Sequence, residues 1–373
     1  MEQGGMIMKK AIRILACAAI LGSAVFTGCE KNGFDSHKGE AVRFSAVSSG
    51  AVSTKTAYGN DVDSYQMINW SVNDTVRIYS DKALHRYGNN QHWADYYTTG
   101  YTADGHKSTA TLAAEQLFNT DNDNENNAAN GLVWGEDGEY NFWGVYPSKK
   151  NNPDITIAEN GAVTATLPIS LTLSTSGTKQ DNNITYNVCA PNMNYAFMTA
   201  ALKKTVPTTE DGYKINLEFE PAFTAFEIYL SSAADEESFS VNSVSLEGND
   251  WLSGPFTMTA GDLSTVAEAD GASKTVTAAF SSAVAITPTT GVNVTLFTIP
   301  KNNVGAIALK VATTDGTATL KFTKKGSKDA YIFEAGHKYR IHLLKVGGRW
   351  EIVFGDNMDV EPWESNSTGL IVE

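Results

Sequence analysis

Apolar and polar residues alternate along most of the chain from residue 41 onward. In residues 214–220 every second side chain is apolar, and residues 226–230 repeat the pattern. A period of two residues is typical of strands that have one buried and one solvent-facing side. Helical periodicity is scarce, and its best example, Ala113–Phe118, allows a turn or two at most. The pattern therefore predicts an all-β fold of stacked antiparallel sheets.

Turn signals separate the alternating runs. Asp315-Gly316 and Gly347-Gly348 each stand between two such runs, as in tight hairpins. Near Asn242 the alternation slips by one residue, so we expect a β-bulge there.

Polar segments mark the expected domain limits. Lys203–Gly212 contains Pro and Gly and lies between two strand-rich halves. It predicts an N-terminal β-sandwich domain at 41–206 and a C-terminal β-sandwich domain at 207–354, which suits a chain of this length. Residues 355–373 follow the last hairpin as a C-terminal tail.

The N-terminus has the pattern of a secretory signal. Basic residues precede the apolar run Ile14–Phe26, which is too short to span a bilayer. The run leads to Gly28-Cys29 and resembles the lipobox of bacterial lipoproteins, although Phe26 departs from the usual Leu. We therefore expect residues 1–28 to be removed, Cys29 to carry a membrane-anchoring lipid, and residues 29–40 to form a tether.

Charge and cysteine content narrow the function classes further. The chain has 42 acidic and 28 basic residues, and its formal net charge of −14 disfavours nucleic acid as a partner. Of its three cysteines, Cys17 lies in the signal and Cys29 is the expected lipid site, so only Cys189 remains. Since one thiol cannot form an internal disulfide, we expect Cys189 to be buried and to serve packing.

Patterns of catalytic or metal-binding chemistry are weak. No histidine pair has zinc-ligand spacing, and phosphate-binding loops and nucleophile elbows are missing from the sequence. Ser176–Lys179 fits a Ser-x-x-Lys spacing without its partner motifs, and we interpret it as a solvated turn. Asp121, Asp123 and Glu125, within the polar insertion Asn119–Gly131, alternate like the start of a calcium loop without its glycine. We therefore expect no enzyme activity, metal or cofactor.

Aromatic residues gather in one short segment. His92–Tyr97 and the nearby Tyr101 place several rings together, and such rings could stack on sugars. Aromatic side chains also fill sandwich cores, and we expect Trp70, Trp143 and Trp350 to pack inside while the Trp93 segment covers one end of a sheet.

Segments spread over most of the chain resemble, in their order and spacing, the fimbrillin family, the lipoprotein-derived pilins also called type V. The resemblance implies two transthyretin-like antiparallel β-sandwich domains in tandem, export as a lipoprotein, and assembly with other fimbrial subunits by strand exchange. The segments that carry it are Ala41–Ala46, Thr54–Thr56, Ile68–Tyr79, Tyr140–Pro147, Leu217–Phe226, Leu252–Phe256 and Phe333–Tyr339.

The resemblance also implies roles for individual residues. In such pilins a protease removes the first strand after a basic residue, and the C-terminal tail of the next subunit fills the groove that is left. Lys55 stands where the family commonly has arginine. The inward residues of the displaced strand would be Val42, Phe44 and Ala46, and the candidate donor residues of the tail are Met358, Val360, Leu370, Ile371 and Val372.

Two functions remain open at this point. One is a fimbrial structural subunit or accessory protein at the outer membrane, cell surface or fimbria, with a host or bacterial surface ligand. The other is a lipid-anchored surface protein that binds a glycan and does not polymerise. Strand exchange distinguishes them, because only the first should change its oligomeric state after loss of residues 41–55.

Overall fold

The computed structural model describes residues 38–49, 57–58, 68–86, 90–104, 107–114, 131–206, 213–300, 307–322, 335–336 and 338–352. They all belong to one compact unit. Within these ranges every element is a strand except the 3₁₀ turn η2 (Met193–Tyr195), so the all-β prediction is confirmed. Ala113 and Ala114 end β7 (Lys107–Ala114) instead of beginning a helix, because both still pair with β6 (Trp93–Asp104).

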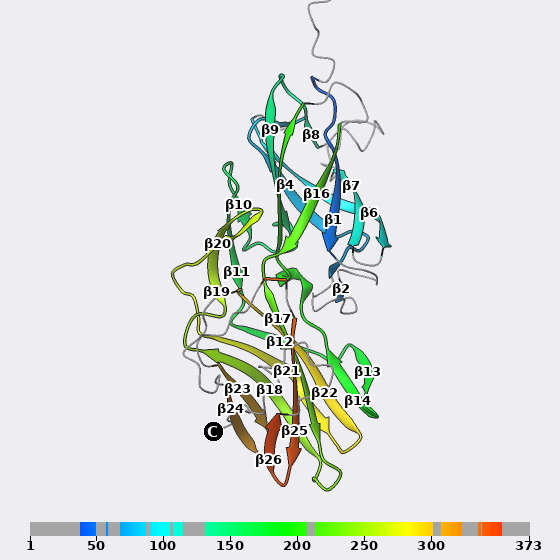
Figure 1. Ribbon diagram of the computed structural model, residues 1–373, viewed down its shortest axis with the longest axis vertical. Helices are drawn as coiled ribbons and strands as arrows, with labels where there is room; N and C mark the ends of the chain where they lie inside the picture. The colour runs from blue at the N-terminus through cyan, green and yellow to red at the C-terminus, as the bar shows by residue number, and fades with distance from the viewer. Residues whose placement is uncertain are drawn as a thin grey trace, which may run out of the picture. The chain divides into compact units, whose positions relative to one another are not determined.

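Seven strands form a closed sheet, which lies in the upper part of Figure 1. Its neighbours are antiparallel except for one parallel pair, β1 and β16. The inward side chains form an aromatic core in which Trp70, Phe142 and Phe219 are fully buried. In hydrogen-bonding order the strands are β1 (Arg43–Ser49), β16 (Lys214–Pro221), β15 (Met198–Thr205), β9 (Glu139–Tyr146), β4 (Thr75–Ser80), β6 and β7.

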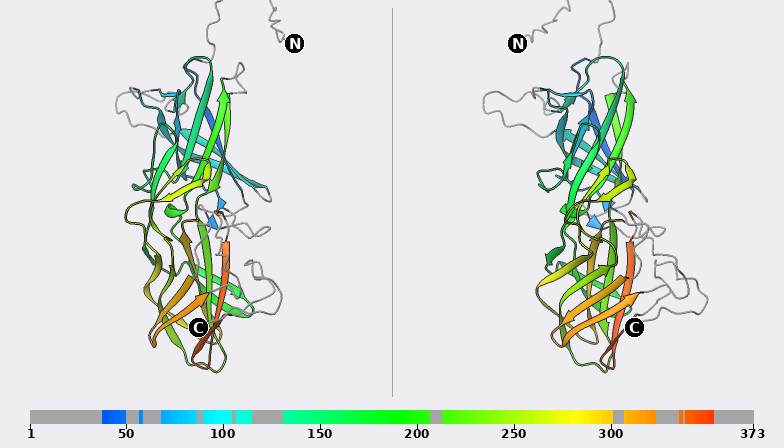
Figure 2. Two further views of the ribbon diagram at one scale, coloured as in Figure 1. Left: turned by 60° about the vertical axis from the view of Figure 1, so that its left-hand side comes forward. Right: turned by 90° about the vertical axis from the view of Figure 1, so that its left-hand side faces the viewer.

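Two further sheets share a second apolar core, in the lower part of Figure 1 and from other sides in Figure 2. The five-stranded sheet contains β12 (Ser170–Leu173), β21 (Thr275–Ile286), β18 (Phe239–Gly248), β23 (Ile307–Thr313) and β24 (Gly316–Phe322). The six-stranded sheet contains β13 (Gly177–Asp181), β14 (Ile184–Cys189), β22 (Thr290–Thr298), β17 (Thr224–Ser232), β25 (Lys338–Val346) and β26 (Arg349–Ile352).

A four-stranded sheet adds its apolar face to the core of the closed sheet. Val163 and Leu167 on one strand and Phe256 on the next are buried in that shared core. The strands are β10 (Thr156–Ile157), β11 (Ala162–Leu167), β19 (Gly254–Thr259) and β20 (Asp262–Glu268). Two short pairs complete the described strands: β2 (Ala57–Tyr58) with β3 (Ile68–Asn69), and β5 (Leu84–His85) with β8 (Leu132–Val133).

The sheets are mixed, which corrects the expectation of purely antiparallel pairing. Parallel pairs are β1 with β16, β12 with β21, β14 with β22, and β17 with β25. Alternation in a sequence shows which side of a strand is buried, but it does not show the direction of the neighbouring strand.

Strand pairing also crosses the expected boundary between residues 206 and 207. β16 follows the boundary yet pairs with β1 and β15 of the closed sheet. β12 and β14 precede it yet pair with β21 and β22. One cut in the chain therefore does not separate the sheets, because strands from both sides of it complete each core.

Local turn chemistry matches the sequence more closely. β23 and β24 pair across the turn that precedes Gly316, and β25 and β26 pair across Gly347-Gly348, where both glycines have positive φ. Residues other than glycine rarely adopt a positive φ. The expected bulge near Asn242 is confirmed by a shift in register between Val241 and Ser243.

Candidate functional site

The first long strand, β1, closes the seven-stranded sheet. On one side it pairs in parallel with β16, from Arg43 opposite Lys214 to Ser48 opposite Phe219. On the other side it pairs antiparallel with β7. Figure 1 shows β1 between these two strands. Because β1 alone joins β7 to β16 in this sheet, its loss would leave both of them with an unpaired edge.

Every second side chain around β1 points into the core, as the alternation predicts. Val42, Phe44 and Ala46 are 3%, 2% and 0% exposed. The Phe44 ring meets the rings of Tyr96 and Phe142 edge-on, with centroids 5.1 and 5.5 Å apart. Aromatic pairs favour such edge-to-face contacts. The three residues assigned to the displaced strand therefore lie inside the core, while their displacement itself stays a prediction.

The opposite end of β1 lies in a more polar setting. Ser48 is buried and pairs with Ser108 on β7, whose hydroxyl accepts a hydrogen bond from the Trp70 backbone N–H at 3.2 Å. The Trp70 ring contacts the ring of Phe219 at 5.3 Å. Trp70, which was expected from the sequence to pack inside, is thus a central side chain at this end of the core.

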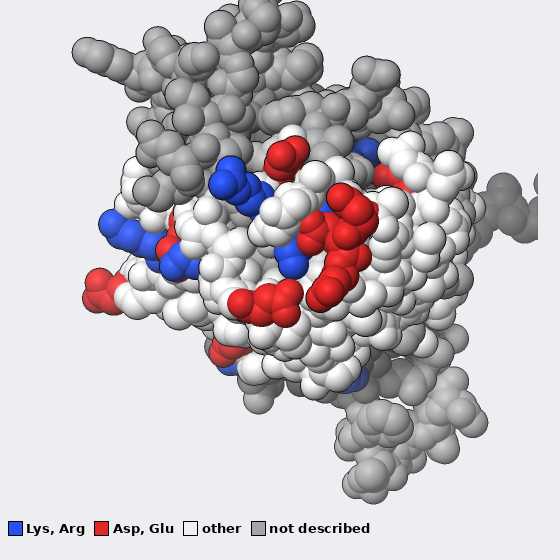
Figure 3. Space-filling view, turned by 90° about the horizontal axis from the view of Figure 1, so that it is seen from below, with Lys and Arg blue, Asp and Glu red and all other residues white. Residues whose placement is uncertain are grey.

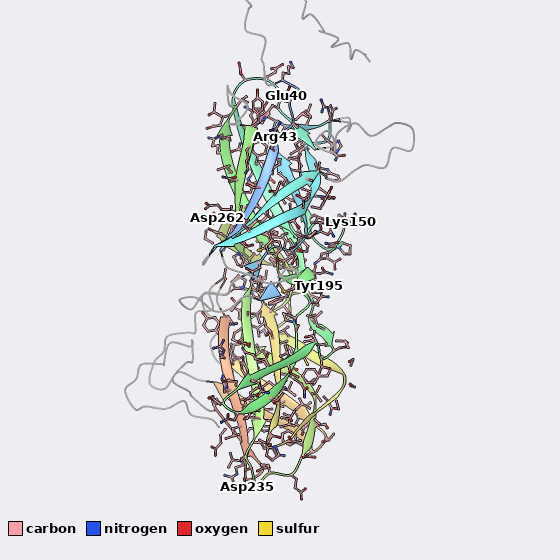
Figure 4. All side chains as sticks on the ribbon, turned by 90° about the vertical axis from the view of Figure 1, so that its right-hand side faces the viewer. Glu40, Arg43, Lys150, Tyr195, Asp235 and Asp262 are labelled. Carbon is pink, nitrogen blue, oxygen red and sulfur yellow. The ribbon has the colours of Figure 1, made fainter. Side chains whose placement is uncertain are left out.

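Backbone hydrogen bonds hold the segment before β1. The N–H of Val42 donates to Leu132 O at 2.9 Å, and that of Gly39 donates to Trp134 O at 2.8 Å. The N–H of Trp134 donates back to Glu40 O at 2.9 Å. Figure 4 labels Glu40 and Arg43 at this end of the strand. The entry into β1 is therefore itself paired, with the segment around β8.

Several residues singled out from the sequence lie outside the described residues. These are the lipid site Cys29, the processing site Lys55, the candidate calcium residues Asp121, Asp123 and Glu125, and the tail residues Met358, Val360, Leu370, Ile371 and Val372.

The aromatic segment proposed for glycan stacking is engaged by protein side chains. Tyr96 is buried, and its hydroxyl accepts a hydrogen bond from the Leu132 N–H at 2.8 Å. Burial raises the pKa of the Tyr96 hydroxyl. The Arg77 guanidinium covers Trp93 at 3.7 Å and also pairs with Asp95 through two hydrogen bonds of 2.8 and 2.6 Å.

A second ring group lies on the same face of the closed sheet. Tyr79 is buried beside two other rings. Its ring centroid lies 6.2 Å from that of His92 and 6.4 Å from that of Trp143. Its pKa is raised to about 12 by burial and by a hydrogen bond to Glu159. Other side chains of the protein thus cover one face of Trp93 and most of Tyr79. Trp143 and Trp350, which were expected to pack inside, are half-buried against the two cores.

A buried ionic cluster in the six-stranded sheet has no counterpart in the sequence predictions. Glu227 on β17 is 7% exposed and lies 3.0 Å from Arg340 Nε, 3.4 Å from Lys338 Nζ and 3.4 Å from Lys179 Nζ. The Tyr229 hydroxyl donates to the same carboxylate at 2.9 Å. Burial alone would raise the pKa of Glu227, but the three cations and the hydroxyl outweigh it and lower the pKa to about 2.

Aromatic side chains extend this cluster across the sheet. The ring of His342 stacks on Tyr229 at 4.3 Å, and Tyr186 meets Tyr229 edge-on at 5.0 Å. Tyr186 reaches this place because it lies over Gly291, where a Cβ would come within 2.5 Å of the Tyr186 ring. Burial lowers the pKa of His342. The cluster therefore joins β13, β14, β17 and β25 through side chains that are distant in the sequence.

The Ser-x-x-Lys segment is part of this structure and not of a nucleophilic pair. Gly177–Asp181 forms β13, which corrects the interpretation of the segment as a turn. Lys179 points to Glu227, whereas the Ser176 hydroxyl donates to Val188 O at 3.2 Å. No local signal could have revealed Glu227, because alternation alone marks it as solvent-facing and its cations come from other strands.

The remaining candidate chemistry is limited. Cys189 is a free, buried thiol in the second core, and burial raises its pKa to about 11. Among the described residues no three His, Cys, Asp or Glu side chains gather as metal ligands, and no described helix is long and apolar enough to cross a membrane.

Figure 3 shows acidic and basic side chains interspersed on the face seen from below. Lys345, for instance, lies 3.3 Å from Asp315 in the C-terminal sheets.

Comparisons with known proteins give structural neighbours only. No family model matches the chain. No curated protein sequence matches it either. Among solved structures, it is similar to a candidate cell adhesion protein of Bacteroides ovatus, with 12% identity over 85% of this chain and 96% of that chain, and a TM-score of 0.48.

Two further neighbours are fimbrial proteins. A fimbrial assembly protein of Parabacteroides distasonis has 13% identity over 84% of this chain and 94% of that chain, with a TM-score of 0.41. The tip fimbrial protein Mfa3 of Porphyromonas gingivalis, truncated at its C-terminus, has 10% identity over 84% of this chain and 98% of that chain, with a TM-score of 0.35.

Proposed function

We propose that this chain is a fimbrial structural or accessory subunit that receives a strand from another subunit in place of β1. The observation that carries the proposal is the position of β1, which closes a sheet between β7 and β16 and places three successive inward side chains in the core. The proposed cleavage after Lys55 would separate β1 covalently from the rest of the chain while leaving the other six strands of the sheet intact.

The energetic case rests on how much β1 contributes. Burying a side chain of the size of Val42 or Phe44 contributes about 1.5–3 kcal/mol, and each ladder hydrogen bond adds about 1 kcal/mol. A whole domain is typically stable by about 5–15 kcal/mol. Loss of β1 would therefore remove a large part of the stability of the closed sheet, and a replacement strand would restore it by β-augmentation.

The remaining parts of the proposal concern residues outside the described ranges. Lipid on Cys29 would hold the subunit at the outer membrane before assembly, and the partners would be other fimbrial subunits. The tail after Phe354 would donate to the groove of another subunit, through residues such as Met358 and Leu370. We propose no enzyme activity. The location would be the cell surface or the fimbria.

Cleavage followed by strand binding tests the proposal. The protein is cut after Lys55, the N-terminal fragment is removed in mild denaturant, and the product is returned to buffer with a peptide of residues 40–49. We expect the peptide to bind and to raise the unfolding temperature. Uncut protein is the control, and it should not bind because β1 already fills the site. A cut product that binds no strand peptide would contradict strand exchange.

A truncation separates the two roles of the subunit. A chain that ends at Phe354 retains β1 and all described strands but lacks the tail. After cutting we expect it to bind the peptide of residues 40–49 as the full-length protein does. Given a trimmed partner subunit, it should fail to donate a strand, whereas the full-length chain should succeed.

A further inference from the structure

The strand β16, which lies beside β1 in Figure 1, presents charged side chains on its outward face. They alternate with buried residues of the core, and all four outward side chains from the start of the strand are exposed: Lys214, Asn216, Glu218 and Glu220. None of the three charged ones has an ion-pair partner in the part of the chain that the structure describes. By contrast, Lys203 and Glu139 in the same closed sheet form an ion pair of 2.5 Å. One wall of the space that β1 fills therefore carries a cation and two carboxylates that no other charge neutralises.

The outward side chains of β1 match this wall at one position and conflict with it at another. Ser45 is 1% exposed, and its hydroxyl donates a hydrogen bond to Asn216 Oδ1. Two residues earlier, Arg43 lies opposite Lys214, and both side chains are exposed. Like charges on neighbouring strands destabilise the pairing of those strands. The first outward position of β1 is therefore electrostatically unfavourable.

The other end of β1 leaves an attractive interaction unmade. Val47, which is half-buried and uncharged, lies opposite Glu218. A basic side chain at this position would face Glu218 directly and Glu220 on the diagonal, which is within the reach of a long side chain. On the other side, β7 pairs with this part of β1 through Thr109 and Thr111, which carry no charge. The charges of β16 thus determine which outward side chains fit best.

We infer, on the basis of the proposed function, that the strand accepted in place of β1 carries an acidic residue opposite Lys214, a serine or threonine opposite Asn216 and a basic residue opposite Glu218. The partner is a strand of another fimbrial subunit with this charge pattern. The order of the charges along the donor also gives its direction. The acidic residue comes first in a strand that runs parallel to β16, as β1 does, and the basic residue comes first in an antiparallel strand.

The inward and outward sides of the donor then have different tasks. Inward apolar side chains provide most of the affinity, because they are removed from water. Exposed ion pairs each change affinity only about two- to fivefold. Such factors are enough to choose between strands whose inward sides fit equally well. They also favour the donor over β1, since β1 forms neither ion pair with β16.

Competition between peptides tests this inference. The full-length protein is cut after Lys55 with the β1 fragment left in place, and labelled peptides of residues 40–49 compete for the space that the fragment fills. The peptides have the native sequence or one substitution: Arg43→Gln, Arg43→Glu, Val47→Lys or Val47→Glu. Arg43→Gln separates the loss of repulsion from the gain of an ion pair. Val47→Glu is the matched control for Val47→Lys, because it places a like charge opposite Glu218.

We expect Arg43→Glu to bind about two- to fivefold more tightly than the native peptide, with Arg43→Gln between them. Overall charge cannot cause this gain, because a chain of net charge −14 disfavours an acidic peptide. Val47→Lys should bind more tightly by a similar factor, and Val47→Glu more weakly. Salt at about 1 M shortens the Debye length to about 3 Å and should remove most of these differences.

Variants of the wall assign the effects to individual residues. In cut protein with Lys214→Glu, the native peptide should bind more tightly than Arg43→Glu, which reverses the order. In cut protein with Glu218→Gln, Val47→Lys should lose most of its advantage. Both positions are exposed, so neither substitution should impair folding.

Three outcomes are decisive. If Arg43→Glu and Val47→Lys bind no more tightly than the native peptide at low salt, the inference is wrong, while binding of the native peptide leaves strand exchange standing. The same holds if Lys214→Glu does not change the order of the Arg43 peptides. If no peptide binds even after the β1 fragment has been removed, the proposed function is wrong and the inference with it.

Discussion

Phe44 and Phe142 meet edge-on across the closed sheet, with ring centroids 5.5 Å apart and an angle of 73° between the rings. The first strand and β9 are not neighbours in that sheet, so this contact joins them through the core instead of through the backbone ladder. Replacing Phe44 therefore tests how much one side chain of β1 contributes to the stability of the fold.

In the uncut protein, Phe44→Ala should lower the free energy of unfolding by about 3–5 kcal/mol, because it removes a fully buried ring and leaves a cavity. Urea denaturation followed by tryptophan fluorescence measures the change. Lys203→Ala is the control in the same sheet. Since the Lys203 and Glu139 side chains are 61% and 51% exposed, breaking their ion pair should change stability by less than about 1 kcal/mol.

Glu227→Gln should destabilise the C-terminal sheets by about 3 kcal/mol, because it leaves the buried Lys338 and its two neighbouring cations without their central carboxylate. Glu247→Gln is the matched control. Its partner is Lys310 at 2.7 Å, and both side chains are more than one-third exposed, so the loss should stay below about 1 kcal/mol. Equal losses for the two variants would show that the Glu227 cluster does not stabilise the sheet.

Acid should reveal the same cluster. The pKa of Glu227 in the folded protein, about 2, lies below its ordinary value of 4.5, so the unfolded chain takes up the proton first as the pH falls. The stabilisation is complete above about pH 4.5 and is lost between that pH and 2. His342, whose pKa is also lowered, adds a loss that begins below 6.5. The free energy of unfolding, measured by denaturation at each pH between 7 and 2, should therefore fall more steeply below pH 4.5 for the wild type than for Glu227→Gln.

Cys189 should be unreactive in the folded protein, because it is buried and its raised pKa of about 11 keeps it protonated near neutral pH. A thiol reagent should label it only in denaturant. Cys189→Ser should cost about 1–2 kcal/mol by burying a hydroxyl group, and Cys189→Ala should cost less. Neither variant should change assembly, and a reducible dimer isolated from cells would contradict the packing role.

Cys29→Ala should release the protein from membranes, since the lipid on this residue is the expected anchor. Detergent-phase partitioning of the wild type and the variant measures the effect. Cys17→Ala is the matched control, because Cys17 lies in the segment that is expected to be removed. Unchanged partitioning of Cys29→Ala would mean that another part of the chain holds it at the membrane.

The sequence shows local features of this fold well and distant pairings poorly. Alternation places Phe44 and Ala46 inside, and the slip near Asn242 is a true bulge. Nothing in the neighbourhood of Arg43 indicates that it pairs in parallel with Lys214. Long-range pairing depends on how whole faces fit together, and a pattern read within one segment carries no record of that fit.

The Glu227 cluster cannot be predicted from the sequence for a related reason. Alternation marks Glu227 as a solvent-facing position between Phe226 and Ile228, whereas in the structure it is only 7% exposed. Lys179 and Arg340 then come from other strands and pair with it. Such a site has no sequence motif, because its members share neither a segment nor a spacing.

If β1 is replaced by another strand as proposed, the pairing of residues 39–42 with the segment around β8 sets the order in which β1 would leave. After a cut beyond Ser49, the severed end of the strand is the one near Ser48, while the opposite end is still clasped by the hydrogen bonds of Gly39 and Val42. Under the proposed exchange, an incoming strand would first pair beside Ser48 and would then extend its pairing toward Phe44.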